Sequence, residues 1–147
     1  EKCWYFSIFF RETLTKGVMH MGLWKKTMLF ALGGCSYMGL ELLWRGWSHG
    51  SMFLAGGSCF LLLGKLNSTR PRLSFPIRAA VGAGIITGVE YAAGLLVNRN
   101  YSVWDYRNTP MNLHGQICLP FCLLWLPIGV VAMCLYSLLD KKILPVD

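Results

Sequence analysis

Two glutamates in apolar segments, Glu41 and Glu90, are the residues of this chain best suited to chemistry. Each ends the same short pattern, G-x5-G followed by an apolar residue and the glutamate. An acidic side chain at the centre of a bilayer costs about 2.5–3.5 kcal/mol on insertion scales, so a matched pair needs an explanation. A carboxylate taken out of water favours its protonated form and can bind and release a proton. We therefore expect the two glutamates to bind a proton, a cation or a substrate.

Other candidate binding residues are expected on the same side of the membrane. Arg45 follows Glu41 by four residues, a spacing that places both side chains on one helix face. His49 and His114 each precede a glycine at the start of an apolar run. The remaining candidates lie in the connection between the last two apolar segments: Trp104, Asp105, Tyr106 and Asn112. Together these residues predict a polar vestibule that opens to the outside and has the two glutamates at its floor.

Structural roles are the alternative for the same residues. Glu41 and Arg45 can neutralise each other, and Glu90 can accept a hydrogen bond from a neighbouring span, for example from Tyr37. A histidine at the membrane interface can simply begin a helix. Two glutamates and two histidines can also hold a divalent cation. However, the sequence has no HExxH or similar spacing, so we expect neither a metal site nor a cofactor.

Composition indicates an integral membrane protein. The chain has 147 residues, of which 54% are hydrophobic and only 14% are charged, more apolar than an ordinary soluble domain. Its apolar blocks approach the roughly 20 residues that a spanning helix needs. We predict an all-α four-helix bundle, with a transmembrane domain at 27–140 and spans at about 27–45, 50–64, 79–97 and 113–139. Residues 1–26 would form a cytoplasmic or interfacial segment, and residues 141–147 a cytoplasmic tail.

The basic residues predict the orientation of this bundle. Eleven of the 14 lie in the N-terminal segment, in the connection between the second and third spans, or in the tail. The other three are Arg45, Arg99 and Arg107. Because cytoplasmic loops carry an excess of lysine and arginine, both termini are predicted to be cytoplasmic, in a multi-pass protein of the plasma membrane. The same distribution indicates that the +7 net charge sets the orientation in the membrane and does not serve to bind nucleic acid.

Glycine positions suggest an internal repeat and close helix packing. The repeated pattern makes the four spans two helical hairpins of the same orientation, which is a parallel repeat. Gly84 and Gly88 form a small-residue face of the kind that lets helices approach closely. Four short spans with such faces bury little, so we expect membrane lipid and either a second copy of the chain or a partner subunit to cover them.

One part of the chain resembles a known family. The residues that carry the resemblance are Trp104-Asp105-Tyr106-x3-Pro110-x-Asn112-x2-Gly115-x-Ile117-Cys118-Leu119, then Leu123-Leu124-Trp125, with Gly88-Val89-Glu90-Tyr91 just upstream. This segment is similar to the ABC-transporter type IV, or CmpB-like, family of small membrane proteins. The resemblance implies a polytopic helical protein that would be the membrane part of a transporter and would need an ATPase subunit. It carries no catalytic residues over to this chain.

The first expected function is therefore a permease-like or ion-coupled transport component. The alternatives are a membrane-embedded enzyme that acts on a lipid or lipid-linked substrate at the outer interface, and a non-catalytic accessory subunit. The sequence contains no G-x-x-x-x-G-K-[ST] motif for nucleotides and no G-x-S-x-G nucleophile elbow. A non-enzymatic role is the expectation.

Overall fold

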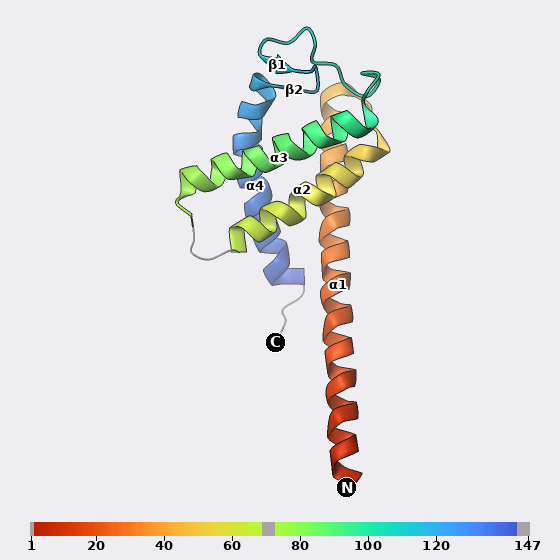
Figure 1. Cartoon of the computed structure of the whole chain (residues 1–147). Helices are drawn as coiled ribbons and strands as arrows, with labels where there is room; N and C mark the ends of the chain where they lie inside the picture. The colour runs from red at the N-terminus through yellow and green to blue at the C-terminus, as the bar shows by residue number, and fades with distance from the viewer. Residues whose placement is uncertain (1, 69–72, 144–147) are drawn as a thin grey trace.

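The computed structural model describes residues 2–68 and 73–143, with side chains described for 22–68 and 73–141. The chain is mostly helical over these residues (Figure 1). Its helices are α1 (Lys2–Arg45), α2 (Gly50–Ser68), α3 (Phe75–Val97) and α4 (Leu119–Ile143). Between α3 and α4 lies a short antiparallel hairpin of β1 (Asn112–Leu113) and β2 (Ile117–Cys118), in which Asn112 pairs with Cys118.

The helices differ from the predicted spans mainly at their starts. The expected boundary near residue 26 falls inside α1, which is continuous from Lys2. The last helix begins at Leu119 and not near residue 113, because residues 112–118 form the hairpin. Pro120 therefore lies in the first turn of α4, where its missing N–H would have no helical partner and no kink is required.

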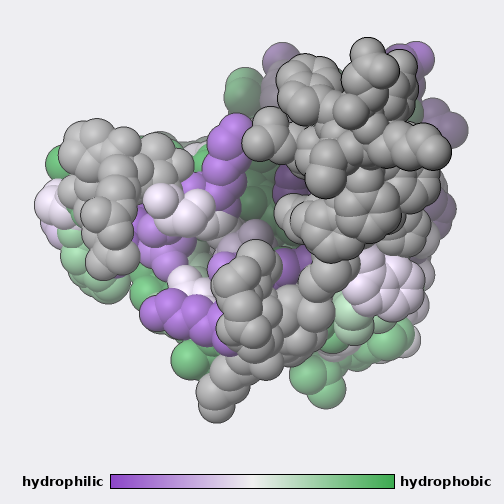
Figure 2. Space-filling model, turned by 90° about the horizontal axis from the view of Figure 1, so that it is seen from below, coloured by the Kyte–Doolittle hydropathy of each residue, from purple (hydrophilic) through white to green (hydrophobic). Residues whose placement is uncertain are grey.

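Long-range polar contacts show which helix ends lie together. At one end, Arg45 Nη1 donates a hydrogen bond of 2.6 Å to the carbonyl oxygen of Val103, in the connection after α3. At the other end, Lys25 Nζ lies 2.8 Å from Asp140 Oδ1, which joins α1 to the end of α4. Figure 2 views the molecule from this second end and shows hydrophilic residues in its middle and at its upper right edge, with hydrophobic residues along its left and lower edges. These contacts mean that α1 and α4 run in opposite directions, while α2 and α3 lie across them in the view of Figure 1.

Glycines bring α1 and α2 into close contact. A Cβ on Gly34 would lie 2.6 Å from the carbonyl oxygen of Phe53, and one on Gly57 would lie 2.7 Å from that of Phe30. Only glycine fits at such distances, so these two positions set the approach of the helices. The predicted packing face on α3 behaves differently, because no described atom lies within 4 Å of a Cβ placed on Gly84 or Gly88.

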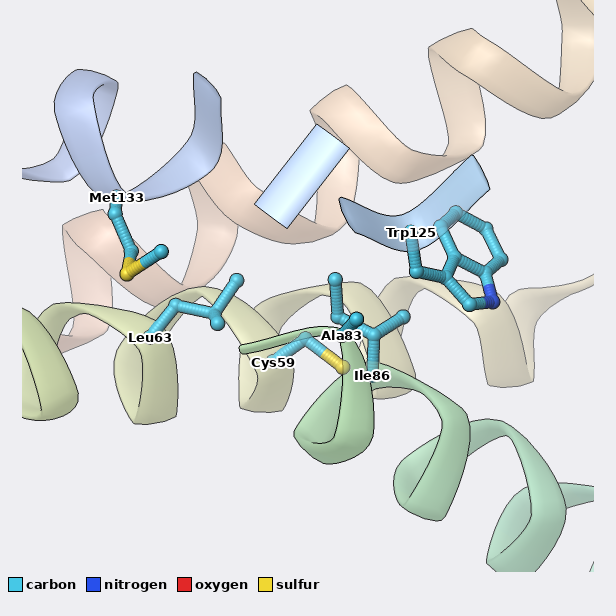
Figure 3. Close-up of a cluster of buried hydrophobic side chains, with 6 residues drawn as sticks. All are labelled: Cys59, Leu63, Ala83, Ile86, Trp125 and Met133. Atoms are coloured by element: carbon cyan, nitrogen blue, oxygen red, sulfur yellow. The ribbon is translucent and has the colours of Figure 1, made fainter. Parts of the chain in front are cut away.

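The main apolar core joins α2, α3 and α4 (Figure 3). It contains Cys59 and Leu63 of α2 together with residues of α3 and α4: Ala83, Ile86, Trp125 and Met133. Leu63 is the most deeply buried of these, at 1% exposure. This core packs α3 and α4 against α2, while the glycines pack α1 on the same helix.

Two of the described helices are long and apolar enough to cross a membrane, α3 and the Leu119–Lys141 part of α4. Only 28% of the most apolar window of α3 and 17% of that of α4 is buried. A core helix of a soluble protein would be mostly buried, whereas these helices expose large apolar side chains such as Leu96 and Val131. The exposed apolar surface and the apolar length of both helices support membrane association.

Candidate functional site

A cavity of about 340 Å³ lies where α1 and α3 end and α4 begins. Residues from all four helices and from the connection after α3 line it. They are Tyr37, Leu40, Glu41, Trp44, Arg45, Met52, Glu90, Trp104, Asp105, Tyr106, Phe121, Leu124, Trp125 and Ile128. The fold therefore brings both candidate glutamates, from separate helices, to one cavity.

Glu90 is the more deeply buried glutamate, with 7% of its surface exposed. Its Oε2 accepts a hydrogen bond of 2.9 Å from Trp125 Nε1, and its Oε1 accepts one of 3.1 Å from the Tyr106 hydroxyl. These donors, and not Tyr37, are its partners; Tyr37 instead stacks on the Trp125 ring. Among the described side chains no lysine, arginine or histidine forms an ion pair with Glu90.

Glu41 has a different environment, because a cation accompanies it. Its Oε1 lies 2.6 Å from Arg45 Nη2, the i, i+4 pairing that the spacing indicates, and its Oε2 accepts a 2.5 Å hydrogen bond from Ser48. The Arg45 guanidinium also lies 4.4 Å from the centre of the Trp47 ring. Its Nε is buried and has no hydrogen-bond partner within the described part of the chain. The charge of Glu41 is thus compensated locally.

Asp105 lies at the edge of the cavity and has its own partner. Arg107 pairs with it, with Nη2 2.7 Å from Asp105 Oδ2. The hydrogen bonds from this guanidinium lower the pKa of Asp105 and in turn raise the pKa of Arg107. Tyr106 follows Asp105 in the chain. Burial, and secondly the negative charge of Glu90, raise the pKa of its hydroxyl, so the hydroxyl stays protonated and can donate a hydrogen bond.

Aromatic rings make up much of the cavity wall. Tyr106 stacks on Phe121 at a centroid distance of 5.0 Å, and Trp44 meets the same ring edge-on at 6.4 Å. Tyr37 and Trp125 stack at 6.1 Å. These contacts pack the rings against one another, and Tyr106 and Trp125 also donate hydrogen bonds to the Glu90 carboxylate.

A buried amide pair holds the connection after α3 against the helices. Asn98 is fully buried; its Nδ2 donates to Trp104 O at 2.7 Å and to Gln116 Oε1 at 3.0 Å, and its Oδ1 accepts from Val103 N at 2.9 Å. Gln116 Nε2 donates back to Asn98 O at 3.1 Å. Trp104 Nε1 donates to Gln116 O at 2.8 Å. The two amides therefore position the Trp104 ring at the cavity.

Three candidates from the sequence do not line the cavity. His49 Nδ1 contacts Ser51 at the start of α2, and the Nδ1 atom of His114 lies 2.8 Å from the Tyr91 hydroxyl. Asn112 donates to backbone oxygens of the neighbouring turn and so shapes the hairpin. Across the part of the chain that the structure describes, no three His, Cys, Asp or Glu side chains gather as metal ligands.

The hairpin turn explains why a histidine and a glycine stand together before α4. His114 and Gly115 both have positive φ, at 51° and 63°. At Gly115 a Cβ would also lie 2.5 Å from Arg107 Cγ, so a side chain here would strain the backbone and would displace Arg107. This H-G pair therefore makes a turn, whereas the H-G pair at 49–50 begins a helix.

Several cavity residues were not among the sequence candidates. They are Tyr37, Leu40, Trp44, Met52, Phe121, Leu124, Trp125 and Ile128. In an apolar helix, sequence spacing does not distinguish a ring that faces a cavity from one that faces lipid. For Trp125 a signal existed, because it belongs to the segment that resembles a known family.

Comparison with known proteins identifies the family. No curated protein and no solved structure matches the chain. A family described as "Putative ABC-transporter type IV" matches residues 35–145, a range that includes every residue lining the cavity. The match covers most of the 147 residues and agrees with the resemblance seen in the W-D-Y segment. The chain belongs to the ABC-transporter type IV family.

Proposed function

We propose that this chain is the membrane component of a transporter and that its cavity holds the transported solute or a coupled ion. The observation that carries the proposal is the convergence of Glu41 and Glu90, from separate helices, on one cavity. Ionisable residues within membrane segments commonly mark a substrate or ion pathway. The family description points in the same direction.

In the proposed arrangement all four helices span the plasma membrane, with both termini in the cytoplasm. The split of basic residues supports this orientation. The cavity then lies in the outer half of the bundle, because it adjoins the Arg45 end of α1 and the connection after α3. In this arrangement the cavity would be the outward-facing vestibule expected from the sequence.

The proposal includes partner subunits. The 147 residues contain no nucleotide-binding P-loop, so a transporter built on them would draw its energy from an ATPase subunit or from an ion gradient. The open faces at Gly84 and Gly88 of α3 suit close contact with a second copy or another membrane subunit.

The test compares cells that express the wild-type chain, Glu90→Gln or Asp140→Asn at equal levels and have no other copy. Asp140→Asn is the matched control, because it makes the same change of carboxylate to amide at the opposite end of the fold. We expect Glu90→Gln to change the internal concentration of at least one small solute several-fold, without a change in membrane lipids. The control should resemble wild type.

Two results would contradict the proposal. If no solute changes in Glu90→Gln cells, the cavity does not serve transport. If a lipid or lipid-linked species accumulates instead, the chain acts as the enzyme that the sequence left as an alternative.

A further inference from the structure

We propose that the cavity binds an alkylammonium group, either on a free organic cation such as choline or on the headgroup of a lipid. The inference rests on the proposed function, since it names the class of solute that the cavity would hold.

Charge is the first argument. Glu41 is paired with Arg45, and Asp105 is paired with Arg107. Glu90 faces the same cavity with two neutral donors and no ion-pair partner among the described side chains. A buried carboxylate without a cation is costly, so a positively charged ligand would relieve that cost. The cavity therefore prefers a cation to an anion.

The wall determines which kind of cation fits. A metal ion requires several oxygen or nitrogen ligands, and the described residues offer no such cluster. The cavity instead presents six aromatic rings: Tyr37, Trp44, Trp104, Tyr106, Phe121 and Trp125. Aromatic faces attract alkylammonium groups through cation–π interactions and also cover their methyl groups. A volume of about 340 Å³ is at the small end of the range for ligand pockets, so it suits a small headgroup.

The mouth of the cavity indicates how the ligand would enter. The most exposed apolar residues of its wall are Leu40 and Trp44 on α1 and Leu124 on α4, with exposures of 49%, 77% and 43%. The opening therefore lies between α1 and α4 and is rimmed by apolar side chains. Such a rim suits entry from the membrane interface, where both a free amphiphilic cation and a lipid headgroup are found.

Binding of radiolabelled choline tests the inference. The purified chain is placed in nanodiscs of phosphatidylglycerol, a lipid without an ammonium group, and saturable binding is measured. The competitors are unlabelled choline, its neutral carbon isostere 3,3-dimethylbutan-1-ol, and the soluble lipid dihexanoylphosphatidylcholine. We expect the neutral alcohol to compete at least about tenfold more weakly than choline, because it keeps the shape and loses the charge.

Three variants sharpen the experiment. Glu90→Gln should weaken choline binding by at least about tenfold. Trp44→Leu should weaken it several-fold and is not expected to disturb folding, because this side chain is 77% exposed. Asp140→Asn should bind choline as the wild type does. Size-exclusion chromatography and circular dichroism check that each variant is folded.

The outcomes test separately the class of ligand, the source of that ligand and the proposed transport function. Stronger competition by the soluble lipid than by choline identifies a headgroup site, and the reverse identifies a free cation. Equal competition by the neutral alcohol, no effect of Trp44→Leu, or no saturable binding at millimolar choline overturns the inference. If choline then fails to bind while solutes in Glu90→Gln cells still change, only the ligand class is wrong. If choline binds as expected and no solute changes, the binding site stands and the transport proposal fails.

Discussion

Replacing Asn98 by alanine should release the connection after α3 from the helices. The substitution removes four hydrogen bonds: three short ones, to Trp104 O and Gln116 Oε1 and from Val103 N, and a longer one of 3.4 Å from Trp104 N. At about 1 kcal/mol for each of the short bonds, the loss is about 3 kcal/mol, before any cost of leaving the partner atoms buried without bonds. That free energy corresponds to roughly a hundredfold increase in local opening of the connection.

The magnitude can be measured by hydrogen exchange of the backbone amides between residues 98 and 118. Asn98→Ala should increase their exchange about a hundredfold, while the helices exchange as in the wild type. Asn100→Ala is the matched control, because Asn100 is an exposed residue of the same turn. A second variant, Asn98→Asp, should be at least as damaging, since its added oxygen faces two acceptors.

The reasoning is refuted if Asn98→Ala changes exchange by less than about fivefold, which is about 1 kcal/mol. It is also refuted if Asn100→Ala has an equal effect, because the amide network would then not be what holds the segment.

Three further predictions concern packing, pH and topology. Gly57→Ala should destabilise the protein by about 1–3 kcal/mol in thermal unfolding, because its Cβ would lie 2.7 Å from a carbonyl oxygen of α1; Gly84→Ala, which has open space, should be neutral or stabilising by up to about 1 kcal/mol. Folding lowers the pKa of Asp105, so its ion pair with Arg107 stabilises the connection at pH values above the pKa that Asp105 has in the unfolded chain. This contribution is lost as the pH falls through the lower pKa that Asp105 has in the folded protein. Proteolysis of this segment should therefore accelerate below about pH 4 in the wild type and be less dependent on pH in Asp105→Asn. Ser102→Cys should react with an impermeant thiol reagent in intact cells, since its segment is predicted to be outside.

Each of these has a clear contrary result. Equal destabilisation by both alanine substitutions would mean that the α1–α2 contact is not set by glycine. Proteolysis of Asp105→Asn that accelerates at acid pH as in the wild type would assign the effect to another group. Labelling of Ser102→Cys only after lysis would invert the predicted orientation.

The sequence by itself determined the features that depend on composition and short spacing. An apolar chain with few charges indicates a helical membrane protein, and residues 2–68 and 73–143 form four helices, of which two are long and apolar enough to span. The four-residue spacing of Glu41 and Arg45 predicted that both side chains share one helix face, and pairing was one of the alternatives considered for them; in the structure they pair. The parallel repeat and the vestibule remain predictions.

Only the tertiary structure decided which distant groups meet. Glu90 accepts a hydrogen bond from Trp125, 35 residues later, and Asn98, just after α3, donates one to Gln116 in the hairpin. Nothing local specifies these pairs, because a helix that is apolar on all sides has no polar face to show which side points inward. The rotation and crossing of the helices follow from close packing at glycines and in the core. This packing leaves the Glu90 carboxylate without a paired cation among the described side chains, whereas Glu41 is paired with Arg45.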